Sequence, residues 1–236
     1  MKIFDKNEFL ILAKNEKEKN IDIINFVNNK IDGRVCLSDW MHFLLALKKY
    51  FKNDIKTYLE IGTLWGGSIS AILWCDYLLN ISTDNYYCID LFSGYYGKNV
   101  NKGDFNKTSV NINESNHLDF CKKNVQLFNL KNNHINFIKG SSYSNKTIDI
   151  IKDYNPQIDF LFIDGDHSYS GVLNDFNIYK NFLNKGAIVV FDNYGGNAWP
   201  EVKKAVDSIN FEKEGFKVFY DFKGKDSGLY LVQKFM

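Results

Sequence analysis

Two carboxylates and an imidazole follow one apolar run, in the segment FLFIDGDHSYSG at residues 160–171. Asp164, Asp166 and His167 stand close together directly after the apolar residues. Carboxylate oxygens are ligands for hard divalent cations, and a carboxylate or an imidazole can act as a general base. The segment therefore predicts a buried strand that delivers metal-binding or acid–base side chains to one place.

A second apolar run, AIVVFDN, ends in Asp192 and Asn193. Neighbouring strands of a doubly wound sheet end at one crevice, so we expect Asp164, Asp192 and Asn193 to meet there as oxygen ligands. Oxygen ligands without a cysteine suit Mg²⁺ or Mn²⁺. The alternative hypothesis is that Asp164 caps the next helix and Asp192 begins a turn, both common positions for aspartate.

A glycine-rich turn adds a different kind of site. The segment YLEIGTLWGGSISAIL predicts a strand that ends at Glu60, a turn with Gly62 and Gly66, and a helix that begins near Ser68. Such glycines let the backbone approach a ligand closely. The segment YYCIDLF ends another strand at Asp90, where an acidic residue can accept hydrogen bonds from ribose hydroxyls. Together they predict a nucleotide-like ligand, although the spacing is not GxGxxG and such a turn can also serve packing alone.

The elements that must position these residues alternate along the chain. Short apolar runs, TYLEIG, YYCIDLF, INFIKG, FLFIDG and AIVVFDN, are separated by amphipathic pieces, which predicts a parallel sheet with helices on both faces. Residues 5–53 predict helices, with Ser38 as a candidate cap. The C-terminal FKVFYDFKGKDSGLYLVQK predicts two more strands, the last antiparallel. We expect an α/β, doubly wound, seven-stranded and mostly parallel sheet over 57–236, with an N-terminal helical cover over 1–56.

Composition limits the classes of function. The 236 residues, 45% hydrophobic, can bury one sizeable core, and 29 Lys and Arg against 28 Asp and Glu give no general field for nucleic acid or an anionic membrane. The four cysteines form no CxxC pair, which favours reduced thiols. No apolar run reaches the length of a membrane span. We therefore expect a soluble cytoplasmic protein without nucleic-acid or membrane partners.

Four segments carry a family resemblance: LEIGTLWGGS, CIDLF, FIKGSS and FIDGDHSYSGVLNDFNIYKNFLNKGAIVVFDNY. They occur in the order expected of class I S-adenosylmethionine-dependent methyltransferases. The sequence from residue 57 onward particularly resembles bacterial metal-dependent O-methyltransferases that act on sugars of antibiotics and surface glycans, and more distantly catechol O-methyltransferases. The resemblance implies a Rossmann-like methyltransferase fold, S-adenosyl-L-methionine as the methyl donor, and Mg²⁺ or Mn²⁺.

The resemblance also implies a role for each matched motif. The glycine turn would hold the methionyl part of the cofactor, the acidic end of the second strand its ribose, and the residues after the third strand its adenine. The implied cofactor-binding residues are Glu60, Gly62, Thr63, Gly66, Ser68, Asp90, Ser141, Ser142 and Asp164. Asp164, Asp192 and Asn193 fall where the family binds its metal. Related enzymes use a base at the position of His167 or of Asp166; we prefer His167, whose alternative reading is a helix-start histidine bonded to a nearby carboxylate.

Acceptor contacts are less specific in the sequence. Aromatic faces stack on sugar rings, although each aromatic residue could equally belong to the core. Candidate wall residues are Tyr194, Gly195, Gly196 and Trp199, then Tyr95 and Tyr96, with Trp40 and His42 closing the pocket from the N-terminal helices. The long segment 93–113 predicts a substrate lid or a surface loop.

Our first hypothesis is a metal-dependent O-methyltransferase acting on a sugar hydroxyl, on a nucleotide-linked sugar or in a capsule, surface glycan or antibiotic precursor. The alternatives are a catechol-like or other small-molecule acceptor, and a non-catalytic cofactor-binding interaction protein. The absence of a basic stripe and of an NPPY-like motif disfavours nucleic acid. We expect a small-molecule acceptor and leave a homo-oligomer open.

Overall fold

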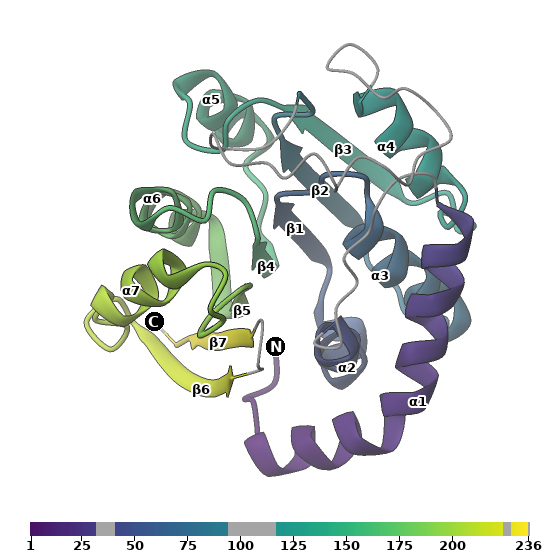
Figure 1. Ribbon diagram of the computed structural model, residues 1–236, viewed down its shortest axis with the longest axis horizontal. Helices are drawn as coiled ribbons and strands as arrows, with labels where there is room; N and C mark the ends of the chain where they lie inside the picture. The colour runs from purple at the N-terminus through teal and green to yellow at the C-terminus, as the bar shows by residue number, and fades with distance from the viewer. Residues whose placement is uncertain (32–40, 94–116, 224–227, 236) are drawn as a thin grey trace.

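The computed structural model describes residues 1–31, 41–93, 117–223 and 228–235. These residues form one sheet of seven strands in the order β3-β2-β1-β4-β5-β7-β6 (Figure 1). The strands are β1 (Thr57–Ile61), β2 (Asn85–Asp90), β3 (His134–Lys139), β4 (Ile158–Ile163), β5 (Leu183–Phe191), β6 (Phe216–Lys223) and β7 (Gly228–Lys234). Strands β1 to β5 pair in parallel, whereas β7 is antiparallel to both of its neighbours. The predicted fold class is confirmed.

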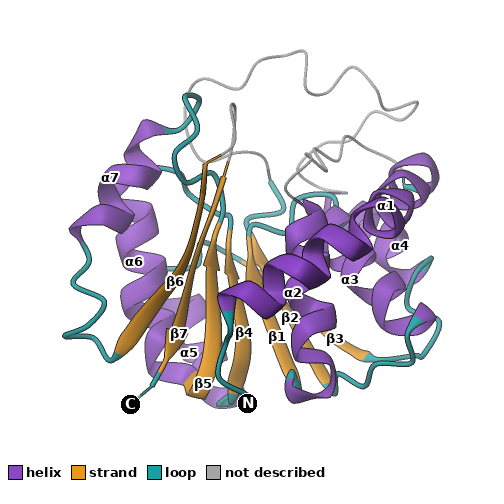
Figure 2. Ribbon diagram, turned by 90° about the horizontal axis from the view of Figure 1, so that it is seen from below, coloured by secondary structure: helices purple, strands orange, loops and turns teal. Residues whose placement is uncertain are grey.

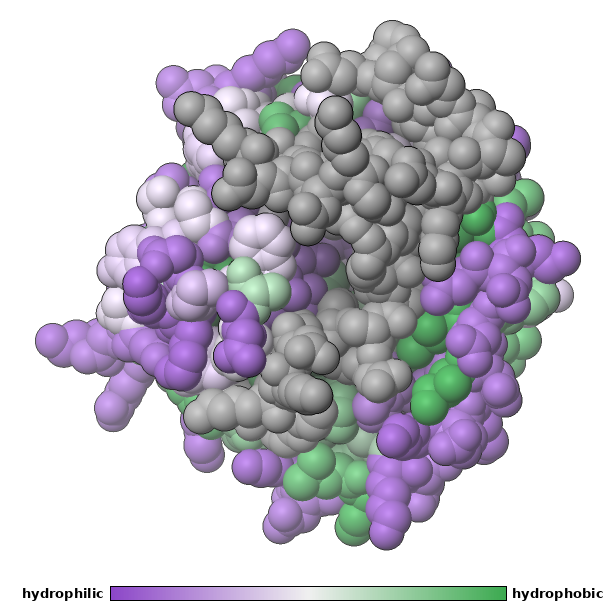
Figure 3. Space-filling model, in the orientation of Figure 1, coloured by the Kyte–Doolittle hydropathy of each residue, from purple (hydrophilic) through white to green (hydrophobic). Residues whose placement is uncertain are grey.

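Helices cover both faces of the sheet (Figure 2). One face carries α1 (Lys6–Lys30), α2 (Met41–Phe51), α3 (Gly67–Leu78) and α4 (His117–Gln126). The opposite face carries α5 (Asn145–Tyr154), α6 (Tyr169–Tyr179) and α7 (Pro200–Ser208). The 3₁₀ turns η1 (Lys52–Asp54) and η3 (Lys180–Phe182) follow α2 and α6. Hydrophilic residues gather along the outer side of α1 (Figure 3).

Strand β4 shows why these apolar runs form central strands. All six of its residues are buried. Phe160 and Phe162 pack into the core layer under α1 to α3, whereas Leu161 and Ile163 pack into the layer under α5 to α7. Successive side chains of a strand point to opposite faces, so a strand covered on both sides needs an unbroken apolar run. The runs that predicted the strands are therefore also the centre of both core layers.

Further expectations concern the N-terminal helices, the cysteines and membrane crossing. Predicted helices at the N-terminus are confirmed as α1 and α2, but the candidate cap Ser38 lies outside the described residues. Within the described chain, Cys75, Cys88 and Cys121 are buried free thiols, in agreement with the expectation of reduced thiols. No described helix combines the length and the hydropathy that a membrane crossing requires.

A buried ion pair joins the N-terminal helices to the sheet. The Lys48 Nζ on α2 lies 2.8 Å from the Asp76 Oδ1 on α3, and both side chains are fully buried. Lys48 also donates to the Thr83 Oγ1 at 2.9 Å, and the Tyr86 hydroxyl donates to the Asp76 Oδ2 at 2.6 Å. Burial lowers the pKa of Lys48, and the Asp76 carboxylate opposes that shift. Helices α1 and α2 thus share the core of the sheet, and a unit boundary at residue 57 stays our proposal.

We predict that Lys48→Met lowers the free energy of unfolding by about 3–5 kcal/mol, because it leaves the Asp76 carboxylate buried without a cation. Denaturant titration measures the change. The control is Lys152→Ala, which breaks an exposed pair with Asp149 and should change stability by less than about 1 kcal/mol. Equal effects of the two substitutions would contradict the prediction.

Candidate active site

The ends of adjacent parallel strands bring the predicted site residues to one edge of the sheet. The Asp164 N–H donates to the Ile61 carbonyl at 2.9 Å, and the Asp192 N–H donates to the Ile163 carbonyl at 2.9 Å. Each bond continues the strand ladder by one residue, so β1, β4 and β5 end level with one another. The expected convergence of Asp164 and Asp192 is confirmed.

The glycine turn after β1 packs directly on the turn after β4. Gly62 has a φ of +96°, and a Cβ on this residue would lie 1.9 Å from the Asp164 carbonyl oxygen. Gly66 has a φ of +83° and forms the N-cap of α3. Only glycine fits at residue 62, because both the backbone conformation and the approach to a neighbouring backbone exclude a side chain.

Glu60 is a fully buried carboxyl group beneath this turn. Its Oε2 accepts hydrogen bonds from the Tyr58 hydroxyl and the Ser68 Oγ, each at 2.9 Å. Its Oε1 is buried and has no hydrogen-bond partner among the residues that the structure describes. Burial raises the pKa of Glu60 to about 7, although the hydroxyls of Ser68, Tyr58 and Thr63 oppose the shift. The arrangement leaves one carboxylate oxygen for a cationic or hydrogen-bond-donating ligand.

Asp90 ends β2 and accepts hydrogen bonds from the backbone of two turns. Its Oδ2 accepts from the Leu64 N–H at 2.9 Å, and its Oδ1 accepts from the Phe92 N–H at 2.7 Å. Burial raises the pKa of Asp90, while these backbone hydrogen bonds oppose the shift. Each carboxylate oxygen has a second lone pair, so Asp90 can accept a further hydrogen bond from a ligand.

His117 and Trp65 support the glycine turn, and sequence reasoning missed both. The two rings lie 4.1 Å apart between centroids, and the His117 Nε2 is 3.2 Å from the Leu64 carbonyl oxygen. Burial lowers the pKa of His117, so it favours the neutral ring. Because His117 begins a helix after the long segment 93–113, no local motif marks it.

Asp164 and Asp192 form a coupled pair of carboxyl groups. Their side chains hydrogen-bond to each other. Burial raises the pKa of Asp164 to about 7 and that of Asp192 well above its usual range. Two carboxyl groups this close cannot both ionise without a nearby cation, so the pair holds a proton at neutral pH. Asp164 does not cap the next helix, because Ser168 is the N-cap of α6.

The donor set fits a hard divalent cation, which would replace that proton. Asp164 and Asp192 would supply carboxylate oxygens, and the adjacent Asn193, whose backbone is left-handed with a φ of +58°, would supply an amide oxygen. Among the described residues, no group of three or more His, Cys, Asp or Glu side chains is arranged as a metal site. A metal here therefore depends on the amide of Asn193 as the third donor.

The two candidate bases have different surroundings. The His167 Nε2 lies 3.1 Å from the Asp164 Oδ1, and the Asn193 side chain hydrogen-bonds to His167. The imidazole stacks on the Trp199 ring at 4.5 Å and 29°. Burial lowers the pKa of His167, which favours the neutral ring that a base requires.

The Asp166 carboxylate has other hydrogen-bond partners. Its Oδ2 accepts from the Tyr143 hydroxyl at 3.0 Å, and its Oδ1 accepts from the Ser168 N–H at 2.9 Å. The structure thus gathers His167, Asp164 and Asn193, whereas the Asp166 carboxylate ties the start of α6 to the turn after β3.

Residues 59–194, more than half of the chain, match a family model described as a methyltransferase domain. The chain belongs to the methyltransferase domain family. The matched region of the methyltransferase domain contains the glycine turn, Asp90, and the turns after β3, β4 and β5.

One relative and two solved structures extend the comparison. The relative is uncharacterized protein R132 of Acanthamoeba polyphaga mimivirus, 35% identical over 169 residues. That match covers 71% of this chain and 65% of the relative, so it spans less than two thirds of the relative's length. An O-methyltransferase from Bacillus cereus in complex with SAH has a TM-score of 0.56 at 16% identity, covering 93% of this chain and 91% of that one. CalS11, described as a TDP-rhamnose 3'-O-methyltransferase of calicheamicin biosynthesis, has a TM-score of 0.54 at 12% identity, covering 92% and 94%. At these identities the structural likeness shows the fold.

Some predicted wall residues of the methyltransferase domain belong to the core instead. The buried Tyr194 donates its hydroxyl to the Asp207 Oδ1 at 2.7 Å and packs on the Tyr230 ring. His42 is buried in α2 with its ring 4.1 Å from Phe43. Tyr194 thus takes the core position that the sequence left open as its alternative, because Asp207 and Tyr230 enclose it. The expectation that His42 closes the pocket is wrong, because its side chain is buried. Trp40, Tyr95, Tyr96 and residues 94–113 lie outside the described residues.

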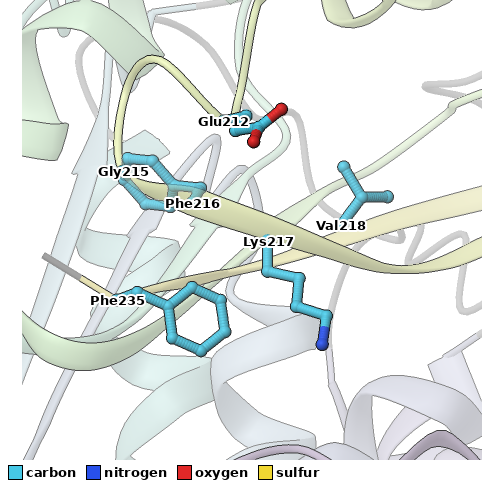
Figure 4. Close-up of a pocket in the computed structure, with 6 residues that line it drawn as sticks. All are labelled: Glu212, Gly215, Phe216, Lys217, Val218 and Phe235. Carbon is cyan, nitrogen blue, oxygen red and sulfur yellow. The ribbon is translucent and has the colours of Figure 1, made fainter.

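The remaining wall residues lie beside the start of α7. Trp199 is 44% exposed, and Gly195 and Gly196 line an open pocket of about 410 Å³. A second pocket, of about 490 Å³, lies at the beginning of β6 between Glu212, Phe216, Lys217 and their neighbours (Figure 4). Because β6 runs in the same direction as β5, this second pocket is at the opposite end of the strands from Asp192.

We predict that Gly62→Ala prevents stable folding, because its Cβ would overlap the Asp164 carbonyl oxygen. Soluble yield and thermal unfolding measure the effect. The matched control is Gly186→Ala, where φ is +86° but the nearest atom, the Met1 Cβ, is 3.1 Å away. That control should lose only about 1–2 kcal/mol of stability from the left-handed conformation. A Gly62→Ala protein as stable as the control would contradict the geometry.

Proposed function

We propose that this methyltransferase domain transfers a methyl group from S-adenosylmethionine to a hydroxyl oxygen of a small sugar-like acceptor, with a divalent cation bound. The observation that carries the proposal is the gathering of four carboxyl groups at the ends of β1, β2, β4 and β5, of which Asp164 is partly exposed and the other three are buried. These groups suit a ligand with cationic and hydroxyl parts. The fold shared with an enzyme described as a TDP-rhamnose 3'-O-methyltransferase supports the sugar acceptor. A cytoplasmic location and a homo-oligomer stay predictions.

The cofactor would lie across the turns after β1, β2 and β3. The free Glu60 Oε1 suits the α-ammonium group of the methionyl part, since a buried carboxylate attracts a cation strongly. Asp90 accepts from the ribose hydroxyls with its remaining lone pairs. Gly62 and Gly66 let the backbone approach the ligand. When bound, the cofactor would bring a positively charged sulfonium, which the carboxyl groups at this edge would stabilise.

Asp164, Asp192 and Asn193 would hold Mg²⁺ or Mn²⁺. When bound, such an ion favours the ionised form of a hydroxyl and orients it. The chain's own contribution is to keep three oxygen donors together at the end of β4 and β5. The raised pKa values of both aspartates support this role, because a cation would release the proton that they share in its absence.

His167 acts as the base in this proposal. It takes the proton of the acceptor hydroxyl, the hydroxyl oxygen forms a bond to the methyl carbon, and the bond from that carbon to sulfur breaks. Stacking on Trp199 and the hydrogen bond with Asn193 hold the imidazole in place. The exposed Trp199 face then offers a platform for an acceptor ring beside the base.

A methyl-transfer screen tests the proposal. Purified protein is incubated with S-adenosylmethionine and a panel of nucleotide-linked sugars, including TDP-rhamnose, with and without Mg²⁺ or Mn²⁺, and products are detected by mass spectrometry. We expect a mass gain of one methyl group on a sugar. Methylation of catechols alone would overturn the sugar assignment, and failure to bind S-adenosylmethionine or its demethylated product SAH would overturn the enzyme class.

We predict that a chelator abolishes turnover but leaves the affinity for SAH nearly unchanged, because the cation positions the acceptor and not the cofactor. Asp192→Ala should behave in the same way. Calorimetry measures SAH binding, and product formation measures turnover. Full activity in excess chelator would contradict the proposed metal.

We predict that His167→Ala lowers kcat by roughly 10²- to 10⁴-fold, the usual effect of losing a general base. Asp166→Asn should retain most of kcat, because the Asp166 carboxylate is bound to Tyr143 and the Ser168 N–H. The pair of variants is compared at saturating substrates over a range of pH. A large loss in Asp166→Asn with near-normal turnover in His167→Ala would assign the base to Asp166.

A further inference from the structure

Helix α6 holds the turn after β3 through two buried side chains. The Ser142 hydroxyl donates to the Asp175 Oδ1 at 2.5 Å, and the Tyr179 hydroxyl donates to the Ser142 carbonyl oxygen at 2.9 Å. All three residues are fully buried. Asp175 and Tyr179 are four positions apart, so they share one face of α6, and both hydrogen-bond to Ser142. We refer to Ser142, Asp175 and Tyr179 as the serine clamp.

The serine clamp bears on the predicted cofactor role of Ser142. The Ser142 hydroxyl is buried and donates to Asp175, so we expect Ser142 to meet a cofactor through its backbone. The neighbouring Ser141 is only partly buried. Any recognition by this turn therefore depends on where the clamp sets the backbone of residues 141–142.

The clamped turn also adjoins the rest of the site. The Gly140 N–H donates to the Asp90 carbonyl oxygen at 2.9 Å, which places the turn beside the proposed ribose-binding residue. Tyr143 donates to the Asp166 carboxylate, which ties the turn to the loop that carries His167. A displacement of this turn would therefore change the site beside the proposed ribose position, where we expect the adenine base.

Asp175 itself is an unusual residue for a purely structural position. Its Oδ2 is buried without a hydrogen-bond partner among the described residues, and it lies 3.2 Å from where a Cβ on Gly165 would be. Burial raises the pKa of Asp175 to about 7. A carboxyl group that is about half protonated at pH 7 can be replaced by an amide of the same shape.

We propose that Asp175 and Tyr179 are positioning residues that fix the backbone of residues 141–142 for the adenine base of the cofactor. The inference rests on the proposed function, because it assumes an adenosyl ligand. Since both side chains are fully buried and hydrogen-bond to Ser142, the clamp acts through Ser142. It should govern affinity for the adenine part of the ligand and leave the methyl-transfer step itself unchanged.

Binding of two ligands by calorimetry tests the inference. The ligands are SAH and S-ribosylhomocysteine, which is SAH without its adenine. Tyr179→Phe should weaken SAH binding by about 2- to 10-fold, the usual effect of losing one hydrogen bond, and leave S-ribosylhomocysteine binding unchanged. The matched control is Tyr86→Phe, which removes a buried hydroxyl bonded to Asp76 near the start of β2 and should leave both affinities unchanged.

Substitutions of Asp175 give a second series of binding measurements. Asp175→Leu should weaken SAH binding, whereas Asp175→Asn, which keeps an acceptor for Ser142, should restore it to near the unmodified value. Equal weakening of both ligands, or an unchanged SAH affinity in both Tyr179→Phe and Asp175→Leu, would overturn the inference alone. Absence of SAH binding in the unmodified protein would overturn the proposed function and this inference with it.

Discussion

Burial of carboxyl groups at one edge of a parallel sheet is the constraint on which the site depends. Glu60, Asp164 and Asp175 each have a pKa raised to about 7. The pKa values of Asp90 and Asp192 are raised as well. Burial raises these pKa values because the protein interior disfavours the charged form of a carboxyl group. Such groups destabilise a fold unless protons or cations neutralise them. The arrangement is therefore poised for a ligand that carries positive charge.

The rest of the fold keeps these groups in place. Parallel pairing sets the strand ends level, and Gly62 lets the turn after β1 press against the turn after β4. The Asp90 backbone contacts, the serine clamp and the Tyr143 to Asp166 hydrogen bond then link neighbouring turns across the edge. Fixed donors and acceptors of this kind need little reorganisation when a ligand binds or reacts.

Much of this could be predicted from sequence because it follows from local patterns. Unbroken apolar runs mark strands buried on both faces, and parallel strands must end at one edge, so Asp164 and Asp192 were expected to meet. What the sequence could not reveal depends on contacts between distant elements. Asp175 lies 33 positions from Ser142 and reads as one polar residue of a helix. Tyr194 looks like a wall residue until Tyr230 and Asp207 enclose it.

Proton release on cofactor binding tests the central claim most directly. SAH is titrated into the protein at pH 7 in buffers of different ionisation enthalpy, and the dependence of the measured heat on the buffer gives the number of protons released. If the ligand ammonium meets the Glu60 carboxyl group, whose pKa is about 7, binding should release about half a proton from it. Glu60→Gln should remove that release. Binding of SAH without any proton release, or a release that Glu60→Gln leaves unchanged, would contradict the account.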